Sequence, residues 1–274
     1  MTKDILLSAT IITYNEEANI GDCIRSVHDW CDEVLVLDSN STDDTRKIAE
    51  GFEKVRFETH AFDGHVQQKN RAIEMARGDW IFSLDADERA TPELGRSARA
   101  FIEKNPEGAG ALVRRLNHHL GRAFRHGGWY HKRYRLLRKG QGAWAGENPH
   151  DMIYINGRPK WKAGMGPTLS GDLIHFSFKD MSDQLDTINK FSSFVAFTRA
   201  GKGKRFSLFG LVYKPMVKFI ELYFLKLGIL DGIPGLIVAS LTSYSAFVKM
   251  AKLYELERTE LERPSNLRSD YKVQ

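Results

Sequence analysis

The stretch DWIFSLDADER, residues 79–89, places two carboxylates one residue apart at the end of an apolar run. Trp80, Ile81 and Phe82 form the apolar run, and Asp85 and Asp87 follow it. Two negative charges at this spacing repel each other unless a cationic group lies close to both. The stretch therefore predicts a buried strand over 79–84 whose carboxyl end holds something positively charged.

Strand and helix patterns alternate on both sides of this stretch. Ile5–Thr13 and Glu33–Asp38 are continuous apolar runs of the kind found in buried parallel strands. Apolar spacing and capping residues predict the remaining elements, which are a strand over Lys54–Glu58 and helices over Glu16–Trp30, Arg46–Phe52, Val66–Ala76 and Pro92–Lys104. The alternation predicts an α/β fold with a mostly parallel central sheet flanked by helices.

Polar clusters follow three of these predicted strands, at Thr13-Tyr14-Asn15-Glu16, Asp38-Ser39 and Asp85-Ala86-Asp87. Ligands of open parallel sheets bind at the carboxyl ends of the strands, so we expect one site there. No G-x-G-x-x-G follows the first strand and no G-x-x-x-x-G-K-[ST] occurs in the sequence, so neither motif is available to bind phosphate. Mg²⁺ or Mn²⁺ can join one or two carboxylates to phosphate oxygens. We therefore interpret Asp85 and Asp87 as a metal bridge to a nucleotide diphosphate.

Charge and cysteine content narrow the class of protein. The 274 residues carry a net charge of +5, which favours an acidic partner such as a phosphate group, a nucleic acid or an anionic membrane. A nucleic-acid partner is not expected, because the acidic strand ends would repel a phosphate backbone. The two cysteines lack metal-ligand spacing, and the first residues lack the pattern of a signal peptide, so we expect a cytoplasmic protein.

The basic charge concentrates in residues 108–146, which contain no acidic residue. The Lys and Arg side chains of this stretch are Arg114, Arg115, Arg122, Arg125, Lys132, Arg133, Arg135, Arg138 and Lys139. Guanidinium groups bind phosphate in a bidentate manner, so we expect Arg135 and Arg138 to bind phosphate groups of an acceptor. The alternative is a solvated basic face.

Several segments resemble the inverting family 2 glycosyltransferases, which have the GT-A fold. The nucleotide-binding half of that family is similar to IITYNEEANI (11–20), VLVLDSNSTDDT (34–45) and QQKNRAIEMARGDWIFSLDADE (67–88). The resemblance extends to the bacterial lipopolysaccharide core glycosyltransferases, including the inner-core β-1,4-glucosyltransferase, through HGGWYHKRYRLLRKG (126–140), LIHFSF (173–178) and the stretch from Gly228 to Glu255. It implies transfer of a sugar, with glucose from UDP-glucose as the expected donor, to a lipid-linked saccharide of the lipopolysaccharide core.

The resemblance also implies roles for residues that bind the donor. Thr13, Tyr14 and Glu16, with Asn15 between them, match the loop that holds the nucleoside, and Asp38 with Ser39 matches the position that reads uracil or ribose. Lys69, beside Asn70, stands near the diphosphate where relatives commonly have an arginine. Ala86 lies inside the D-x-D. The alternative for Asp38 is a turn residue in DSNSTDD.

Metal and base positions follow from the same resemblance. Asp85 and Asp87 match the D-x-D, with Asp87 as the direct metal ligand, and His175 completes the metal site. Asp151 falls at the position of the catalytic base, where relatives carry a glutamate; Glu147 is the second candidate. The alternatives are that Asp85 and Asp87 cap a helix beginning near Thr91, that Asp151 is a surface carboxylate, and that His175 is a core histidine.

We expect a catalytic domain over 1–200, with a nucleotide-sugar half (1–107) and an acceptor half (108–200), and a helical region over 201–274. The uncharged run Gly232–Val248 is too short and too polar for a membrane span. Apolar residues interleaved with lysines favour peripheral attachment at the inner face of the inner membrane, whereas packing on the catalytic domain or homo-oligomer formation is the alternative. Other functions left open are transfer to a polyprenyl phosphate or another membrane glycolipid, and anion binding without catalysis.

Overall fold

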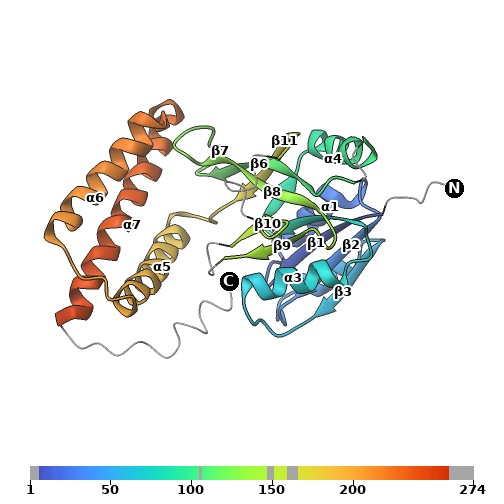
Figure 1. The fold of residues 1–274 in the computed structure, drawn as a ribbon, viewed down its shortest axis with the longest axis horizontal. Coiled ribbons are helices and arrows are strands. Elements are labelled where there is room, and N and C mark those ends of the chain that lie inside the picture. The colour runs from blue at the N-terminus through green and yellow to red at the C-terminus, as the bar shows by residue number, and fades with distance from the viewer. Residues whose placement is uncertain (1–5, 105–106, 147–150, 159–165, 259–274) are drawn as a thin grey trace. The chain divides into compact units, whose positions relative to one another are not determined.

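The computed structural model describes residues 6–104, 107–146, 151–158 and 166–258 (Figure 1). The chain divides into two compact units, which are described separately. Among the described residues, the first contains those up to Arg115 together with His131–His175, and the second contains Leu116–Tyr130 and Phe176–Arg258. The chain passes from one unit to the other after Arg115, after Tyr130 and after His175. The functional division into 1–107, 108–200 and 201–274 stays a prediction.

Four parallel strands form the nucleus of the first unit and pair in the order β3-β2-β1-β4. Their bounds are β1 (Leu7–Thr13), β2 (Glu33–Asp38), β3 (Val55–Thr59) and β4 (Trp80–Asp85). Each strand lies within two residues of its expected range. The predicted parallel sheet is therefore confirmed in this half of the chain.

The sheet continues past β4 through strands that the sequence patterns did not predict. Nine strands belong to it within the described residues, and the order after β4 is β8-β6-β11-β5, with β7 paired to β6. The pairs β4–β8, β6–β7 and β5–β11 are antiparallel. These strands are β5 (Glu88–Ala90), β6 (Gly110–His119), β7 (Arg122–Ala123), β8 (Tyr130–Arg138) and β11 (Thr168–Phe176); β9 (Gly142–Ala145) and β10 (Met152–Ile155) form a separate hairpin.

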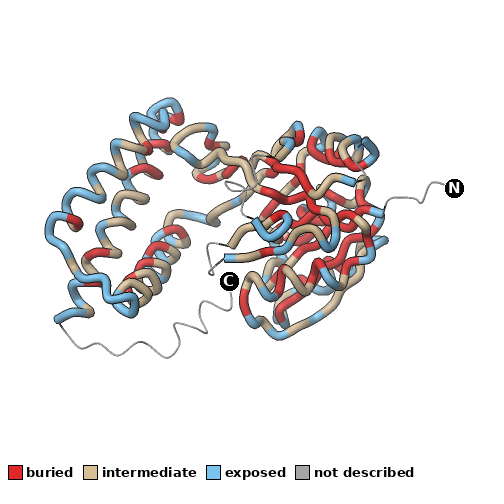
Figure 2. Tube along the Cα trace, in the orientation of Figure 1, coloured by how far each residue is buried: buried red, intermediate tan, exposed pale blue. Residues whose placement is uncertain are grey.

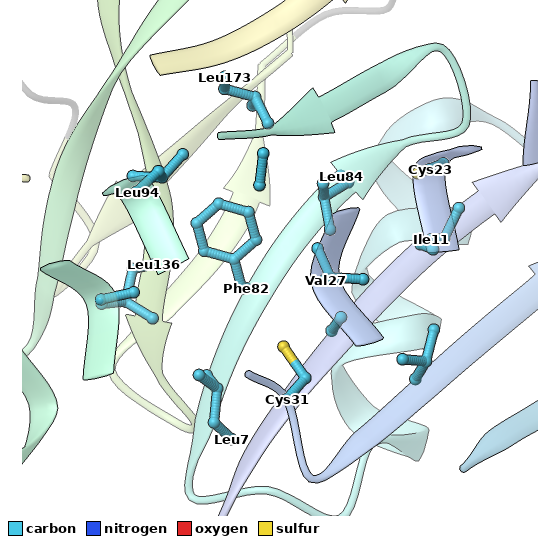
Figure 3. Close-up of a cluster of buried hydrophobic side chains, with 14 of the residues drawn as sticks. Leu7, Ile11, Cys23, Val27, Cys31, Phe82, Leu84, Leu94, Leu136 and Leu173 are labelled. Atoms are coloured by element: carbon cyan, nitrogen blue, oxygen red, sulfur yellow. The ribbon is translucent and has the colours of Figure 1, made fainter. Parts of the chain in front are cut away.

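Helices cover both faces of the parallel strands, because alternate residues of each strand point to opposite faces. On β2, Val34 and Val36 enter one hydrophobic core, while Leu35 and Leu37 enter the other. The first core includes Phe82 and is shown in Figure 3. It packs under α1, α2 and α4, and the second packs under α3 and the β9–β10 hairpin. These helices are α1 (Ile20–His28), α2 (Thr45–Glu50), α3 (His65–Met75) and α4 (Pro92–Lys104).

The second unit is mainly helical, and α7 packs against both α5 and α6. Its elements are α5 (Met181–Gly201), α6 (Leu208–Ile220), a π-helix η1 (Glu221–Leu225), a 3₁₀ helix η2 (Gly228–Asp231) and α7 (Gly232–Arg258). The buried carboxylate of Asp231 accepts a hydrogen bond from the backbone N–H of His126 at 3.1 Å and lies 3.5 Å from Arg122. These contacts fasten the loop before β8 to the start of α7. A Cβ at Gly235 would lie 2.1 Å from the Gly228 carbonyl oxygen, so only glycine fits this corner.

Large apolar side chains lie exposed along α6, η1, η2 and α7, and Figure 2 shows that buried residues are sparse on these helices. We call this set the apolar surface. Phe209 and Leu225 are its most exposed members besides Ile233, at 73% and 76%. The complete set is Leu208, Phe209, Val212, Tyr213, Met216, Val217, Ile220, Phe224, Leu225, Leu227, Ile229, Leu230, Ile233, Leu236, Tyr244, Phe247 and Tyr254.

The length of the last helix differs from the expectation. Among the described residues, one helical segment, Gly228–Arg258, has the length and composition needed to cross a membrane. The prediction that this region is too short was wrong, because it counted only the uncharged run, whereas the 27 residues of α7 continue through the charged positions that follow. At about 1.5 Å per residue, α7 alone is about 40 Å long. Only 22% of the most apolar window is buried.

Candidate active site

The three polar strand ends meet at one edge of the sheet, as the sequence predicted. Thr13 pairs with Asp38, and Ile12 pairs with Asp85, so the ends of β1, β2 and β4 are aligned. The loop after β1 is tied to the loop after β2 through Asn15, which has a left-handed backbone (φ 51°). Its N–H donates to the Ser41 hydroxyl at 2.8 Å, and its side-chain oxygen accepts from the Thr42 N–H at 2.8 Å.

The expected nucleoside-binding residues lie in and beside these loops. Asp38 is buried, and its carboxylate accepts hydrogen bonds from both the backbone N–H (2.7 Å) and the hydroxyl of Ser41. Asp38 therefore stabilises the turn that follows β2, as the alternative interpretation of this residue expected. Its role in binding a nucleoside stays a prediction. The Ser39 hydroxyl accepts from Gln68 at 3.2 Å. The buried hydroxyl of Thr13 has no hydrogen-bond partner among the described residues. Tyr14 and Glu16 are partly buried, and Glu16 accepts from the Asn19 amide at 2.7 Å.

The positive charge beside Asp85 is that of Lys69, whose side chain is only 7% exposed. The Lys69 ammonium lies 2.9 Å from Asp85 and 3.0 Å from Asp151, and 4.0 Å from the centre of the Trp144 ring. Burial opposes the charged form, but the two carboxylates outweigh it and raise the pKa of Lys69. A single ammonium group therefore joins the D-x-D to the expected base.

A second cation holds the other oxygen of Asp85. Arg135 lies 3.3 Å from that oxygen and 2.5 Å from the fully buried Glu88. Arg115 contacts the same oxygen of Glu88 at 2.9 Å, and the second oxygen of Glu88 accepts from the Asp85 N–H at 3.0 Å. Although burial would raise it, Lys69, Arg135 and Arg115 hold the pKa of Asp85 well below its usual range. Removing one member of such a buried network leaves an unpaired charge, which costs about 3–5 kcal/mol.

Arg138 is not brought to this network. It pairs with Trp80, at the amino end of β4, and its guanidinium contacts Glu107 at 2.7 Å. Arg135 and Arg138 therefore lie at different ends of β4. The assignment of both to acceptor phosphate stays a prediction, but the structure places only Arg135 at the site edge.

Asp87 points to a different partner. One of its oxygens lies 3.0 Å from Nε2 of His175, and the other is buried without a hydrogen-bond partner among the described residues. Burial favours the neutral acid, yet His175 outweighs it and lowers the pKa of Asp87. The helix-capping alternative does not hold, because β5 intervenes and the Thr91 hydroxyl accepts from the Leu94 N–H at 3.4 Å at the start of α4.

Asp87 and His175 by themselves supply only part of the coordination shell of a divalent cation. The part of the chain that the structure describes contains no group of three or more His, Cys, Asp or Glu that could hold a metal. Asp87 nevertheless has one free buried oxygen with His175 beside it. Mg²⁺ typically takes one or two carboxylates and completes its shell with phosphate oxygens and water. The residues therefore fit a metal that arrives with a diphosphate.

Asp151 immediately precedes β10, and its side chain is 10% exposed. The surface-carboxylate alternative is thus not supported, because Asp151 lies in the ion pair with Lys69. Glu147, the second candidate base, lies outside the described residues.

The sequence patterns missed two residues that shape the site, Trp144 and Glu88. Trp144 lies under both Lys69 and Arg135, and its indole N–H donates to the Ser83 hydroxyl at 3.2 Å. Asn70 holds the Trp144 backbone from both sides, at 2.8 and 2.9 Å. No motif marked Trp144, because it lies 74 residues from Asn70. Glu88 directly follows the D-x-D, so its position was a usable signal.

Comparison with known proteins places this arrangement in context. The model of "Glycosyl transferase family 2" matches residues 8–156. The lipopolysaccharide core biosynthesis glycosyltransferase LpsC of Rhizobium meliloti is 31% identical over 93% of this chain and 94% of its own length. An uncharacterized glycosyltransferase of Rickettsia typhi is 30% identical over 91% of this chain and 87% of its own.

Solved structures give a more partial likeness. Glucosyl-3-phosphoglycerate synthase of Mycobacterium tuberculosis, crystallised with Mn²⁺, uridine diphosphate and phosphoglyceric acid, is 25% identical at a TM-score of 0.35 over 42% of this chain. TarS of S. aureus is 26% identical at a TM-score of 0.33 over 41% of this chain. The chain spans 44% and 21% of the lengths of these two proteins, respectively.

Proposed function

The chain belongs to glycosyl transferase family 2, and from this membership we propose that it moves a sugar from a nucleotide-sugar donor, with inversion, onto a lipopolysaccharide core acceptor. It is a glycosyltransferase with a GT-A-type mixed α/β fold. The proposed donor is UDP-glucose. Similarity to LpsC over 93% of the chain supports the acceptor class.

The observation that carries the proposal is the free buried oxygen of Asp87 beside His175, at the sheet edge shared with Thr13 and Asp38. Asp87 and His175 would hold Mg²⁺ or Mn²⁺, which would supply stabilisation of the charge that develops on the leaving diphosphate. Asp85 is already paired with Lys69 and Arg135, so we assign it to orienting the site and to the donor.

An inverting transfer is a one-step displacement and needs one base on the acceptor hydroxyl. We assign that base to Asp151, whose carboxylate is held by Lys69 at 3.0 Å and is close to fully buried. The lysine restricts the carboxylate to one position, which favours a productive geometry. Glu147 remains the second candidate.

The nucleoside and diphosphate are assigned to the polar loops at the carboxyl ends of the strands. The strand ends and loops contain most of the residues expected from the sequence, namely Thr13, Tyr14, Asn15, Glu16, Asp38, Ser39, Asp85 and Ala86. Lys69 and Asn70 are contributed by α3. The hydrogen bonds of Asn15 to the second loop support a single preformed surface. The buried hydroxyl of Thr13, which lacks a partner among the described residues, supports a polar ligand there.

We further propose that the enzyme works at the cytoplasmic face of the inner membrane. The apolar surface supports this, since large exposed apolar patches mark protein or membrane interaction sites. Exposed Lys202, Lys204 and Arg205 directly precede α6 and would favour an anionic leaflet. We propose surface attachment, because Lys249 and Lys252 place positive charge on α7; a span by Gly228–Arg258, whose length and composition would allow it, is the outcome that the test must separate. A homo-oligomer that covers the same surface is the alternative.

A screen of nucleotide sugars tests the function. The purified chain is incubated with UDP-glucose, UDP-galactose and other donors, with and without Mn²⁺ or Mg²⁺, and with a deacylated lipopolysaccharide core oligosaccharide. We expect metal-stimulated transfer from UDP-glucose to the core. Transfer only to a polyprenyl phosphate would replace the acceptor, and no donor turnover with any acceptor would refute the proposal.

A further inference from the structure

Arg133 differs from its basic neighbours because it has no hydrogen-bond or ion-pair partner in the described part of the chain. It lies on β8, two residues before Arg135, and is partly buried. Among the residues that the structure describes, none accepts a hydrogen bond from Arg133 or forms an ion pair with it. Arg135 and Arg115, by contrast, both contact Glu88, at 2.5 and 2.9 Å. The guanidinium of Arg133 thus keeps all its N–H donors available for a ligand.

The surroundings of Arg133 favour a negatively charged ligand. Burial lowers the pKa of Arg133, the positive charges of Arg115 and Arg135 lower it further, and only the carboxylate of Asp151 opposes them. A guanidinium stays protonated at neutral pH, so these influences mean that its charge is poorly compensated. An oxyanion beside it would relieve repulsion among three arginines while forming charge-assisted hydrogen bonds.

The position of Arg133 indicates which substrate carries the anion. Arg133 and Arg135 lie two residues apart on β8, so their side chains leave the same face of the sheet. On that face Arg135 contacts Asp85, which Lys69 joins to Asp151, the proposed base for the acceptor hydroxyl. The proposed metal position at Asp87 and the nucleoside loops are assigned to the donor. A ligand of Arg133 would therefore lie on the acceptor side.

We propose that Arg133 binds an oxyanion carried by the acceptor saccharide, either a phosphate or a sugar-acid carboxylate, next to Asp151. This deepens the proposed glycosyl transfer and rests on it for the identity of the acceptor. It assigns to Arg133 the phosphate-binding role that the sequence analysis expected of Arg135 and Arg138. The Nη2 group of Arg135 is directed to Asp85 and Glu88, and Arg138 contacts Glu107 at the other end of β4.

Direct binding tests this without requiring turnover. The probes are deacylated lipopolysaccharide core oligosaccharide, the same material after phosphatase treatment, and the same material after carboxyl reduction. Their dissociation constants are measured by calorimetry for the unmodified chain, Arg133→Gln, Arg133→Lys and, as a matched surface control, Arg96→Gln on α4. Binding of UDP is measured in parallel for each.

We expect the unmodified chain to bind the intact probe about 10-fold or more tightly than one of the two treated probes, which identifies the anion. Arg133→Gln should abolish this preference, Arg133→Lys should keep part of it, and Arg96→Gln should keep all of it. UDP affinity should change less than about 2-fold in Arg133→Gln, well below the tenfold that about 1.4 kcal/mol represents.

Three results would overturn the inference: a preference that survives in Arg133→Gln, the lack of any preference in the unmodified chain, or a loss of UDP affinity in Arg133→Gln. The last would move Arg133 to the donor. Failure of the proposed function is recognised separately, because a chain that prefers the intact probe but transfers no sugar to it retains the anion site without the proposed reaction.

Discussion

The edge of the sheet in the first unit and the apolar surface of the second unit differ in which side chains they bury and which they expose. At the sheet edge, charged groups are buried and paired, as with Lys69, which is 7% exposed between two carboxylates. On the apolar surface, uncharged groups that a core normally buries face outward, as with Phe209 at 73% exposure. The first arrangement pairs its charges internally, whereas the second leaves large apolar groups exposed, which is typical of surfaces that bind a partner or a membrane.

The two regions therefore differ in what a ligand adds. Near the sheet edge a ligand meets a few free polar groups, such as the buried oxygen of Asp87 and the guanidinium of Arg133. At the apolar surface, the binding free energy of a partner comes from burying apolar area, at about 25 cal/mol per Å² removed from water. Substitutions that separate these two effects are the sharpest tests of the comparison.

The largest effect is expected from Asp87→Asn. Loss of the carboxylate should lower transfer by about 1000-fold or more, because metal-assisted charge stabilisation contributes several kcal/mol. Steady-state transfer rates measure this, with circular dichroism to show that the fold is intact. Asp29→Asn, at an exposed carboxylate after α1, is the matched control and should retain activity.

The same variant sharpens the comparison, because binding to anionic vesicles should be unchanged in Asp87→Asn. Full activity of Asp87→Asn, or full activity of the unmodified chain in excess chelator, would contradict the assignment of Asp87 and His175 to a metal.

A smaller effect is expected from Asp151→Asn. Loss of a general base typically lowers the rate by about 100-fold or more, so turnover should fall by that factor while donor affinity changes little. Transfer rates and calorimetric binding of UDP are the two measurements. If Glu147→Gln shows this pattern and Asp151→Asn does not, the base is Glu147.

The smallest effect is expected from Leu225→Ser on the apolar surface. Burying a leucine in lipid is worth about 1.5–3 kcal/mol, so vesicle binding should weaken about 10-fold or more. Flotation with vesicles containing anionic lipid, at low and high salt, measures the loss. Leu185→Ser is the matched control, since Leu185 is 42% exposed on α5 and lies outside the apolar surface.

Transfer to a soluble, deacylated acceptor should be unaffected by Leu225→Ser, which would separate the two regions. If the unmodified chain binds no vesicles at low salt, the membrane role is wrong, and a concentration-dependent dimer would then account for the surface. Extraction by detergent only would indicate that Gly228–Arg258 crosses the bilayer.

Local patterns were sufficient for the parallel half of the sheet. The apolar runs that became β1, β2 and β4 are buried on both faces, and such runs differ clearly from the helical spacing of α1 and α4. Polar clusters at the ends of those runs also showed that Thr13, Asp38 and Asp85 meet at one edge, because parallel strands align their carboxyl ends.

Which charges pair with which could not be obtained from local patterns. Lys69 reaches Asp151 across 82 positions, and Glu88 joins Arg135 across 47. Such partners are chosen by long-range packing of β8 and the β9–β10 hairpin against the parallel strands, not by spacing along the chain. The sequence showed that residues 108–146 are basic; only the packed fold shows that Arg115 and Arg135 are neutralised internally while Arg133 is left free among the described residues.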